Sequence, residues 1–233
     1  MSYTSNIQQA RIEQLARNIL SITDNLKGNV EAKDFVNFPL ALFFYRFISE
    51  NLVFFINEHE RQINLLFDYQ WIRDQAAEQL LQTVAREKWF FLLPSQLFGN
   101  VHKMARNEHL LMIPKDVFAN IKTSAKETDY IPNYSKKIMA NLKNFYYYYL
   151  TPTEKWRWDN FLFRKDFDLN SPELGETIRE RNGKLIEIMD LLACIQIYDL
   201  VKETINYKIN EILDLQLDIH CAIDRIIKKH IQN

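Results

Sequence analysis

The chain has 233 residues, of which 47% are apolar and 25% charged, with only 4 glycines and 6 prolines. This is the composition of a globular protein with enough chain for one large domain or two small ones, and so few glycines exclude a Gly-rich phosphate loop or a propeller. Lys and Arg total 29 against 30 Asp and Glu, which excludes bulk charge as a reason to expect nucleic acid or acidic lipid as a partner.

Apolar residues recur every three or four positions along most of the chain, a spacing that predicts helices, and strand-like alternation is nearly absent. The first apolar stripe consists of Ile12, Leu15, Ile19, Ile22 and Leu26. It ends at Gly28, which we expect in the left-handed conformation that closes a helix. Asn29 is predicted to cap a second helix over about residues 30–58, which is apolar on nearly all sides and therefore buried.

The predicted environment of the chain is the cytoplasm. The most apolar stretch, residues 38–56, is interrupted by Arg46, Glu50 and Asn51 and falls short of the ~18 apolar residues that a bilayer requires. The first residues lack the apolar core and cleavage site of a secretory signal. Cys194 and Cys221 fit no metal-binding spacing, so we expect two free thiols in a reducing compartment and no membrane association.

Further helices are predicted over about residues 71–89, over 94–104 and from Pro114 onward. The triplet Ser171-Pro172-Glu173 is typical of a helix start, because a capping hydroxyl precedes Pro at the first helical position. The segment just before it, residues 161–170, is irregular and is the best candidate for an extended segment.

A long last helix is predicted from Leu191 onward, with isoleucines at most steps of four and three residues. The positions of this possible seam between copies of the chain are Ile205, Ile209, Ile212, Ile219, Ile223 and Ile226. Such a heptad seam favours self-association, so a homodimer is one interpretation, and an amphipathic helix lying on its own domain is the other. The predicted fold is all-α, with a multi-helix globular domain over residues 1–192 and a helical arm over residues 193–233.

No pattern of a catalytic or metal-binding site is found. The five histidines supply no HExxH pair, and no GxSxG sequence occurs. Asp166, Asp168 and Asn170 begin like a calcium loop, but Ser171 and Thr177 stand where that loop requires Gly and Glu. We therefore expect local capping from these side chains, and we predict no metal, no catalytic residue and no cofactor site in this chain.

Charge is distributed unevenly, with four more basic than acidic residues between Val101 and Phe145. The basic residues of this segment are Lys103, Arg106, Lys115, Lys122, Lys126, Lys136, Lys137 and Lys143. The spacing of Lys115, Lys122 and Lys126 puts three ammonium groups on one face of a predicted helix, as a surface that follows phosphates requires. An ordinary solvated helix face has the same spacing, so weak binding of double-stranded DNA and a solvated face both stay open.

Two stretches of the chain show the residue order of a known family. Within residues 22–52, one helix ends in Leu-Lys-Gly-Asn, and the next begins with an acidic residue and ends in Arg-Phe-Ile-Ser-Glu. This order resembles the opening of the N-terminal helical domain of the modification subunit of type I restriction-modification systems, an adenine-N6 DNA methyltransferase subunit. The matching positions include Leu26, Lys27, Gly28, Asn29, Arg46, Ser49 and Glu50.

The second stretch, residues 166–192, resembles a segment near the end of the same domain, Asp-x-Asp-x-Asn-Ser-x-x-Leu-Gly-x-Thr-x-x-x-Arg-Asn-x-x-Leu. Its matching positions include Asn170, Gly175, Arg181 and Asn182. Residues 92–105 and 118–125 match weaker elements in the same order, so the resemblance covers about residues 12–192. Pro39 departs from the family, which has an aliphatic residue there, so the start of that helix is expected to differ.

The resemblance implies a non-catalytic helical domain that contacts methyltransferase and specificity subunits and helps to enclose double-stranded DNA. The family's catalytic domain carries a glycine-containing S-adenosylmethionine loop and an Asn-Pro-Pro-Phe/Tyr motif, and this sequence contains neither. S-adenosylmethionine is therefore expected only on a full-length catalytic relative, because chemistry on a flipped base needs that pocket. The alternative is a stand-alone oligomerising protein that binds or regulates restriction-modification subunits.

Overall fold

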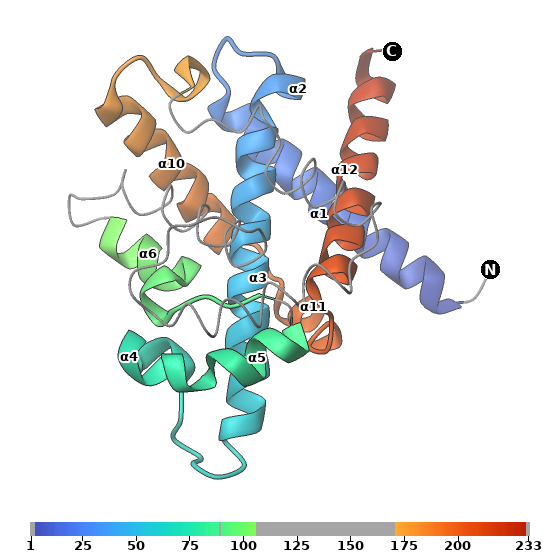
Figure 1. Ribbon diagram of the computed structural model, residues 1–233. Coiled ribbons are helices and arrows are strands. Elements are labelled where there is room, and N and C mark those ends of the chain that lie inside the picture. Colours follow the sequence, from blue (N-terminus) through green and yellow to red (C-terminus); the bar gives the residue numbers. More distant parts are fainter. Residues whose placement is uncertain (1–2, 89, 106–170, 232–233) are drawn as a thin grey trace. The chain divides into compact units, whose positions relative to one another are not determined.

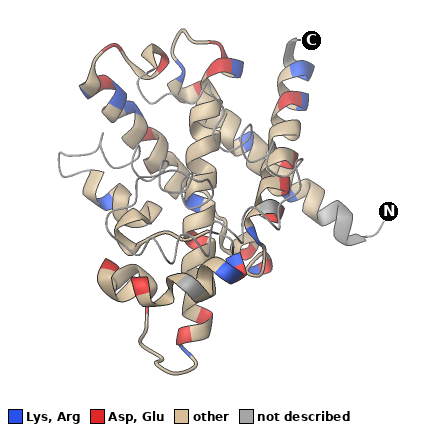
Figure 2. Cartoon of the chain, viewed as in Figure 1, with Lys and Arg blue, Asp and Glu red and all other residues tan. Residues whose placement is uncertain are grey.

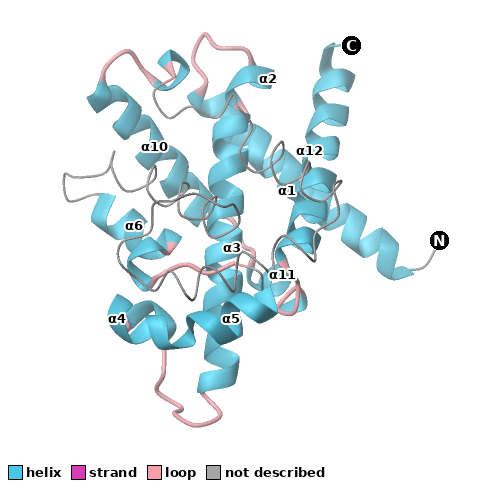
Figure 3. Ribbon diagram, viewed as in Figure 1, coloured by secondary structure: helices cyan, strands magenta, loops and turns pink. Residues whose placement is uncertain are grey.

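The computed structural model of the chain describes residues 3–88, 90–105 and 171–231 (Figure 1). The described residues form α-helices, short 3-10 helices and loops, without a strand among them (Figure 3). The predicted all-α fold class is therefore confirmed. Cys194 and Cys221 are exposed and unpaired, as expected for free thiols.

The chain divides into two compact units, each assembled from separate parts of the sequence. Unit 1 takes its described residues from Met1–Tyr45, Asn160–Gln196 and Ile212–Asn233, and unit 2 from Arg46–Asp159 and Ile197–Glu211. The boundary between these units that lies nearest to the expected one at residue 192 follows Gln196.

Unit 1 contains α1 (Tyr3–Leu26), α2 (Ala32–Phe35), η5 (Pro172–Leu174), α10 (Ile178–Ala193) and most of α12 (Ile209–Ile231). Helix α1 contacts both α2 and α10. Apolar residues three and four positions apart put one face of each long helix into the core. The buried residues include Ile12, Leu15, Ile19 and Ile22 on α1, Leu185, Ile188 and Leu192 on α10, and Ile212, Ile219 and Ile223 on α12.

Unit 2 contains the part of α3 (Asn37–Glu60) from Arg46 onward and a series of short helices. These are η1 (Tyr69–Trp71), α4 (Asp74–Ala77), η2 (Glu78–Leu80), α5 (Leu81–Lys88), η3 (Pro94–Gln96), α6 (Phe98–Ala105) and α11 (Tyr198–Glu203). Buried polar groups join segments that are distant in sequence. The Tyr69 hydroxyl donates to Leu92 O at 2.7 Å, and Asn51 Nδ2 donates to Thr204 O at 2.9 Å.

The predicted second helix is divided into α2 and α3. The first helix ends as predicted, with Gly28 at φ 57°. Asn29 does not cap the next helix, because the N-cap of α2 is Glu31, which makes no side-chain capping bond. The break at Val36 follows from Pro39, since its ring nitrogen has no N–H to donate to the carbonyl four residues earlier and suits only the first turn of a helix.

The predicted continuous helix from Leu191 onward is wrong. Helix α10 ends at Ala193, α11 spans Tyr198–Glu203, and α12 begins at Ile209. Helix α12 keeps the amphipathic pattern, but the interruptions divide the predicted heptad pattern into three parts. The predicted helix over residues 71–89 is likewise divided, into η1, α4, η2 and α5.

One helical stretch of the described chain, Ala32–Glu60, is long and apolar enough to cross a membrane by length and composition alone. In its most apolar window, 83% of the residues are buried inside the structure. This burial is the property expected of a core helix, in agreement with the interpretation from the sequence.

Candidate functional site

The basic segment is represented among the described residues by Lys103 alone. This residue is exposed on α6, and its Nζ lies 4.1 Å from the ring centroid of Trp71, which is 65% exposed. Such an exposed cation–π contact contributes about 0.5–1 kcal/mol. The remaining predicted DNA-contacting residues, Arg106, Lys115, Lys122, Lys126, Lys136, Lys137 and Lys143, lie outside the described residues.

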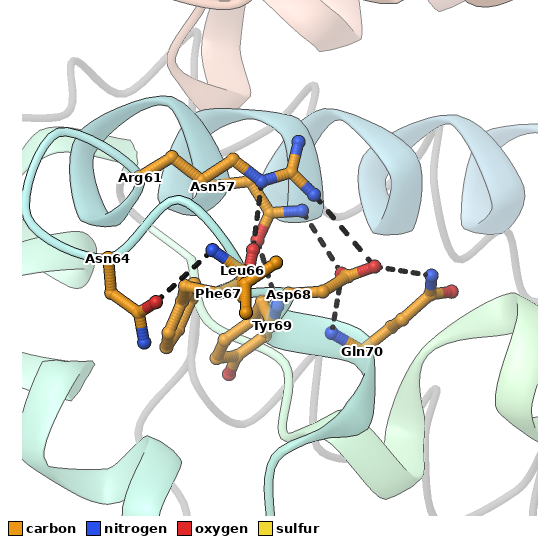
Figure 4. Close-up of polar contacts among 8 residues, drawn as sticks. All are labelled: Asn57, Arg61, Asn64, Leu66, Phe67, Asp68, Tyr69 and Gln70. Atoms are coloured by element: carbon orange, nitrogen blue, oxygen red, sulfur yellow. Dashed lines mark hydrogen bonds and ion pairs between the residues drawn. The ribbon is translucent and has the colours of Figure 1, made fainter.

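A network of hydrogen bonds around Asp68 fixes the chain after α3 (Figure 4). Asp68 Oδ1 accepts from Asn57 Nδ2 at 3.1 Å, and Asp68 Oδ2 accepts from Gln70 Nε2 at 2.9 Å. Asn57 Oδ1 in turn accepts from the Tyr69 amide at 2.8 Å. Burial by itself would raise the pKa of Asp68, but the hydrogen bonds from Gln70 and Asn57 and the charge of Arg61 outweigh it and lower that pKa.

The turn enclosed by this network displays apolar side chains to solvent. Ile63, Leu65 and Leu66 are 90%, 86% and 93% exposed. The backbone of the turn is nevertheless held in place, because Arg61 Nε donates to Phe67 O at 2.8 Å and the Leu66 amide donates to Asn64 Oδ1 at 3.1 Å (Figure 4). The turn is therefore an ordered loop of unit 2 that exposes apolar side chains to solvent.

A pocket of about 270 Å³ lies between α3, η1, α6 and α11 in unit 2, and we call it the α3–α11 pocket. Its apolar lining includes Val53, Phe54 and Leu97. Its polar lining includes Glu50, Gln70 and Asn100. The Asp68 network holds one of these polar side chains, Gln70, in position.

Lys88 is a fully buried lysine in unit 2 that the sequence analysis did not single out. Its Nζ donates to Asn51 Oδ1 at 2.5 Å, to Ile205 O at 2.8 Å and to Tyr207 O at 2.5 Å. It also lies 5.2 Å from the ring centroid of Phe55. Burial lowers the pKa of Lys88 to about 7, against an opposing effect of Glu211. Lys88 thereby fastens the chain between α11 and α12 to α3 and α5.

The family-motif positions of the first stretch make structural contacts, both within α3 and with α6. Arg46 Nε forms an ion pair with Glu50 Oε1 at 2.6 Å one turn along α3, and Ser49 Oγ accepts from the Phe98 amide at 3.1 Å at the start of α6. Gly28 supplies the left-handed residue after α1, next to the motif positions Leu26, Lys27 and Asn29. These residues set helix ends and helix contacts.

The positions of the second stretch build the start of α10. Gly175 has φ 145°, and a Cβ there would lie 2.6 Å from Glu180 Cβ. Arg181 Nη1 donates to Gly175 O at 3.0 Å and to Glu176 O at 2.8 Å. Arg181 Nε and Asn182 Oδ1 are buried without a hydrogen-bond partner in the described structure. Asn170 lies outside the described residues.

A capping box at Thr177 was missed in the sequence, although its Thr-x-x-Glu spacing is the known signal. Thr177 Oγ1 accepts from the Glu180 amide at 3.2 Å, and Glu180 Oε2 accepts from the Thr177 amide at 2.9 Å. The predicted start at Ser171 is also present, since Ser171 Oγ accepts from the Glu173 amide. It opens the short 3-10 helix η5 and not an α-helix.

The isoleucines predicted to form a seam between copies lie mostly in the interior of the chain. Ile209, Ile212, Ile219 and Ile223 are at most 1% exposed, whereas Ile205 and Ile226 are half-buried. Four of the six positions are therefore already covered by this chain itself. The last helix is interpreted either as a seam between copies or as an amphipathic helix that lies on its own domain. The burial of these four positions favours the second interpretation.

A wide groove of about 960 Å³ lies between α1, the chain after it and the end of α12 in unit 1, and we call it the α1–α12 groove. Its apolar lining consists of Leu20, Ala222, Ile226 and Ile227 together with Ala32. Charged residues of both signs line it as well, among them Glu13, Arg17, Asp24, Arg225 and Lys229. Figure 2 shows both signs of charge along α12. Apolar area with a mixed charged border is typical of a surface that receives a helix.

Comparison with known proteins identifies the family. The HsdM N-terminal domain family matches residues 15–147, more than half of the chain. The methylase subunit of the type I restriction enzyme MpnII of Mycoplasma pneumoniae is 30% identical over 209 residues, which are 86% of this chain and 34% of that protein. The crystal structure of a type I restriction-modification methyltransferase subunit from Streptococcus thermophilus is similar with a TM-score of 0.58 and 16% identity, over 92% of this chain and 38% of that one.

The match covers the same part of the chain as the first motif, whose positions run from Leu26 to Glu50. The likeness to the crystal structure shows the fold, and the chain spans about a third of the length of the curated relative. This chain therefore belongs to the HsdM N-terminal domain family of type I restriction-modification methylase subunits.

Proposed function

We propose that this chain is a non-catalytic helical part of a cytoplasmic type I restriction-modification methyltransferase system. In this role it contacts methyltransferase and specificity subunits and helps to enclose double-stranded DNA. The family match over residues 15–147 is the observation that carries the proposal. The absence of an S-adenosylmethionine loop and of an Asn-Pro-Pro-Phe/Tyr motif from the sequence supports a role without chemistry of its own.

The α1–α12 groove is the surface that we assign to subunit contact. Its apolar residues on α12 alternate with exposed residues that do not line it, which gives a matched pair for a test. Ile227→Glu places a carboxylate in the groove, whereas Cys221→Glu places one on an exposed part of the same helix. Only the first change should weaken binding to a partner subunit, by about tenfold or more.

The experiment is sedimentation of the chain mixed with the methyltransferase and specificity subunits of its own type I system. We expect co-migration of the parent chain and of Cys221→Glu, and loss of co-migration for Ile227→Glu with an unchanged circular dichroism spectrum. Failure of the parent chain to co-migrate would overturn the role in subunit contact. Calorimetric titration of the chain alone with S-adenosylmethionine should show no specific heat, and micromolar binding would contradict the non-catalytic role.

DNA contact is tested separately. Between residues 101 and 145 the sequence carries an excess of four positive charges, so we expect weak duplex binding without sequence preference. This binding should weaken as the salt concentration rises, because the release of counterions from the DNA phosphates then becomes less favourable. Replacing Lys115, Lys122 and Lys126 by Glu should abolish a fluorescence-anisotropy signal with a labelled duplex. Equal binding by this triple variant would show that these lysines are not a DNA-contacting surface.

A further inference from the structure

Three polar side chains that line the α3–α11 pocket each have an oxygen atom that accepts no hydrogen bond in the described structure. Asn100 Nδ2 donates both of its hydrogens, to Gln70 O at 2.9 Å and to Pro94 O at 2.8 Å. Both partners are backbone carbonyls that can only accept, so the orientation of the Asn100 amide is fixed. The Asn100 Oδ1 acceptor remains without a hydrogen bond in the described structure.

Gln70 is arranged in the same way. Its Nε2 donates to the carboxylate of Asp68 at 2.9 Å, which again fixes the amide orientation because a carboxylate only accepts. Its Oε1 lies on the side of the amide away from Asp68 and makes no hydrogen bond in the described structure (Figure 4). A second acceptor is thus available among the side chains that line the pocket.

Glu50 is the one charged residue among the described residues that line the pocket. Arg46 Nε binds its Oε1 at 2.6 Å, which orients the carboxylate one turn along α3. The second oxygen, Oε2, has no hydrogen bond among the described residues, and the side chain is 40% exposed. The third available acceptor, Glu50 Oε2, therefore belongs to a negatively charged carboxylate.

Two aromatic rings line the same pocket. Phe54 and Tyr198 meet edge to face, with their ring centroids 5.9 Å apart, and Tyr198 is 59% exposed. Aromatic faces attract cations, and a guanidinium group can also stack on them. The pocket volume of about 270 Å³ is just below the roughly 300–1,000 Å³ of drug-sized ligand sites, which favours a single long side chain as the occupant.

We propose that the α3–α11 pocket binds the side chain of an arginine from a partner polypeptide. A guanidinium group offers five N–H donors in one plane, which suits three separate acceptors better than the compact ammonium of lysine does. Its positive charge complements Glu50, and its flat face complements Phe54 and Tyr198. This binding does not depend on the α1–α12 groove, because the described residues that line the pocket belong to unit 2 and those that line the groove belong to unit 1.

The experiment is an NMR titration of the ¹⁵N-labelled chain with the blocked tripeptide acetyl-Gly-Arg-Gly-amide. We expect saturable shifts of the side-chain amide signals of Asn100 and Gln70 and of the backbone amide of Gly99, which also lines the pocket. The matched probe replaces arginine by citrulline, which keeps the shape and removes the charge. It should bind about tenfold more weakly or not at all, since charge-assisted hydrogen bonds are lost.

Variants place the binding in the pocket. Glu50→Gln should weaken it by about tenfold, and Tyr198→Ala, at an exposed position where folding is not at risk, by about fivefold. Glu87→Gln removes an exposed carboxylate of α5 outside the pocket and should leave binding unchanged. If Glu50→Gln unfolds, as its amide spectrum will show, Tyr198→Ala decides in its place.

Three results would overturn the proposal. The first is the absence of shifts at Asn100, Gln70 and Gly99 with the arginine peptide. The second is equal binding of the arginine and citrulline peptides, which would exclude recognition of the cation. The third is tighter binding of free L-arginine than of the blocked peptide, which would identify a small-molecule site in place of a contact with a polypeptide.

Discussion

At the scale of single residues, the half-buried Asp68 and the buried Lys88 decide the path of the loops of unit 2. Asp68 fixes two amide side chains, Asn57 and Gln70, and Lys88 fixes two backbone carbonyls near residue 206. A buried donor or acceptor that loses its partner costs about 1–3 kcal/mol, and a half-buried one costs less, so these two residues have more influence on stability than exposed ion pairs do.

Replacing Asp68 by Asn should lower the free energy of unfolding by about 1–2 kcal/mol at pH 7, because an amide cannot accept all the hydrogen bonds that the carboxylate accepts. The folded state lowers the pKa of Asp68. Its contribution is therefore complete above the unfolded-state pKa of about 4 and is lost as the pH falls below it. Urea unfolding at pH 7, 5 and 3 should show that the free energy of unfolding decreases less in acid for Asp68→Asn than for the parent. Glu58→Gln, an exposed change on α3, should behave like the parent.

Replacing Lys88 by Met should destabilise the chain by at least about 2 kcal/mol, since Asn51 Oδ1 and the carbonyls of Ile205 and Tyr207 lose their donor. The pKa of Lys88 is lowered to about 7 in the folded state. Between that pH and about 10.4 the unfolded chain binds the extra proton, so the stability that Lys88 contributes rises with pH. The stability difference between the parent and Lys88→Met, measured by urea unfolding from pH 7 to 9.5, should therefore increase. A constant difference would contradict this effect of burial.

At the scale of helices, starts and ends follow local chemistry, and so they follow the sequence. Gly28 ends α1 in the left-handed conformation, Pro39 restricts α3 to a start just before it, and Thr177 with Glu180 opens α10. The motif positions of the family are largely of this kind, because Gly175 and Arg181 also shape the start of α10. In this chain these positions therefore shape the ends of helices.

Thr177→Ala should destabilise the chain by about 1 kcal/mol, because the Glu180 amide loses its capping acceptor. Thr83→Ala on α5 is the matched control, since Thr83 is exposed inside a helix, where alanine is a better helix former. Thermal unfolding followed by circular dichroism measures both variants. Equal stability of Thr177→Ala and the parent would show that the capping box contributes nothing measurable.

At the scale of the whole molecule, neither unit is continuous in sequence. Residues 197–211 belong to unit 2, and the residues of α12 after them belong to unit 1. The last forty residues therefore contribute to both units. Removing them would expose buried surface in both units.

Ile219→Asp should unfold the chain and not merely separate its copies, because Ile219 is fully buried and an unpaired carboxylate there costs more than about 4 kcal/mol. Cys221→Asp, at an exposed position of the same helix, should leave the fold intact. Circular dichroism and light scattering together distinguish the outcomes. If the parent is a dimer and Ile219→Asp is a folded monomer, the prediction is wrong and the isoleucines form a seam between copies.

The sequence by itself determined the helical class, the end of the first helix at Gly28 and the family, because the period of 3.6 residues and a glycine stop act within a few residues. It also predicted a buried second helix, although not its break before Pro39. It did not predict the α3–α11 pocket, nor that Lys88 would be buried, because neither has a local signal.

The tertiary structure decided which surface covers each apolar face. An isoleucine stripe has the same pattern whether it packs on its own chain or on a second copy, and only the fold buries Ile212 and Ile219 in this one. The hydrogen bond from Asn51 to Thr204 joins residues 153 positions apart, and the bond from Asn100 to Gln70 in the pocket joins residues 30 positions apart. The physical reason is that periodicity specifies the face that a helix buries, whereas the partner of that face depends on how distant segments meet.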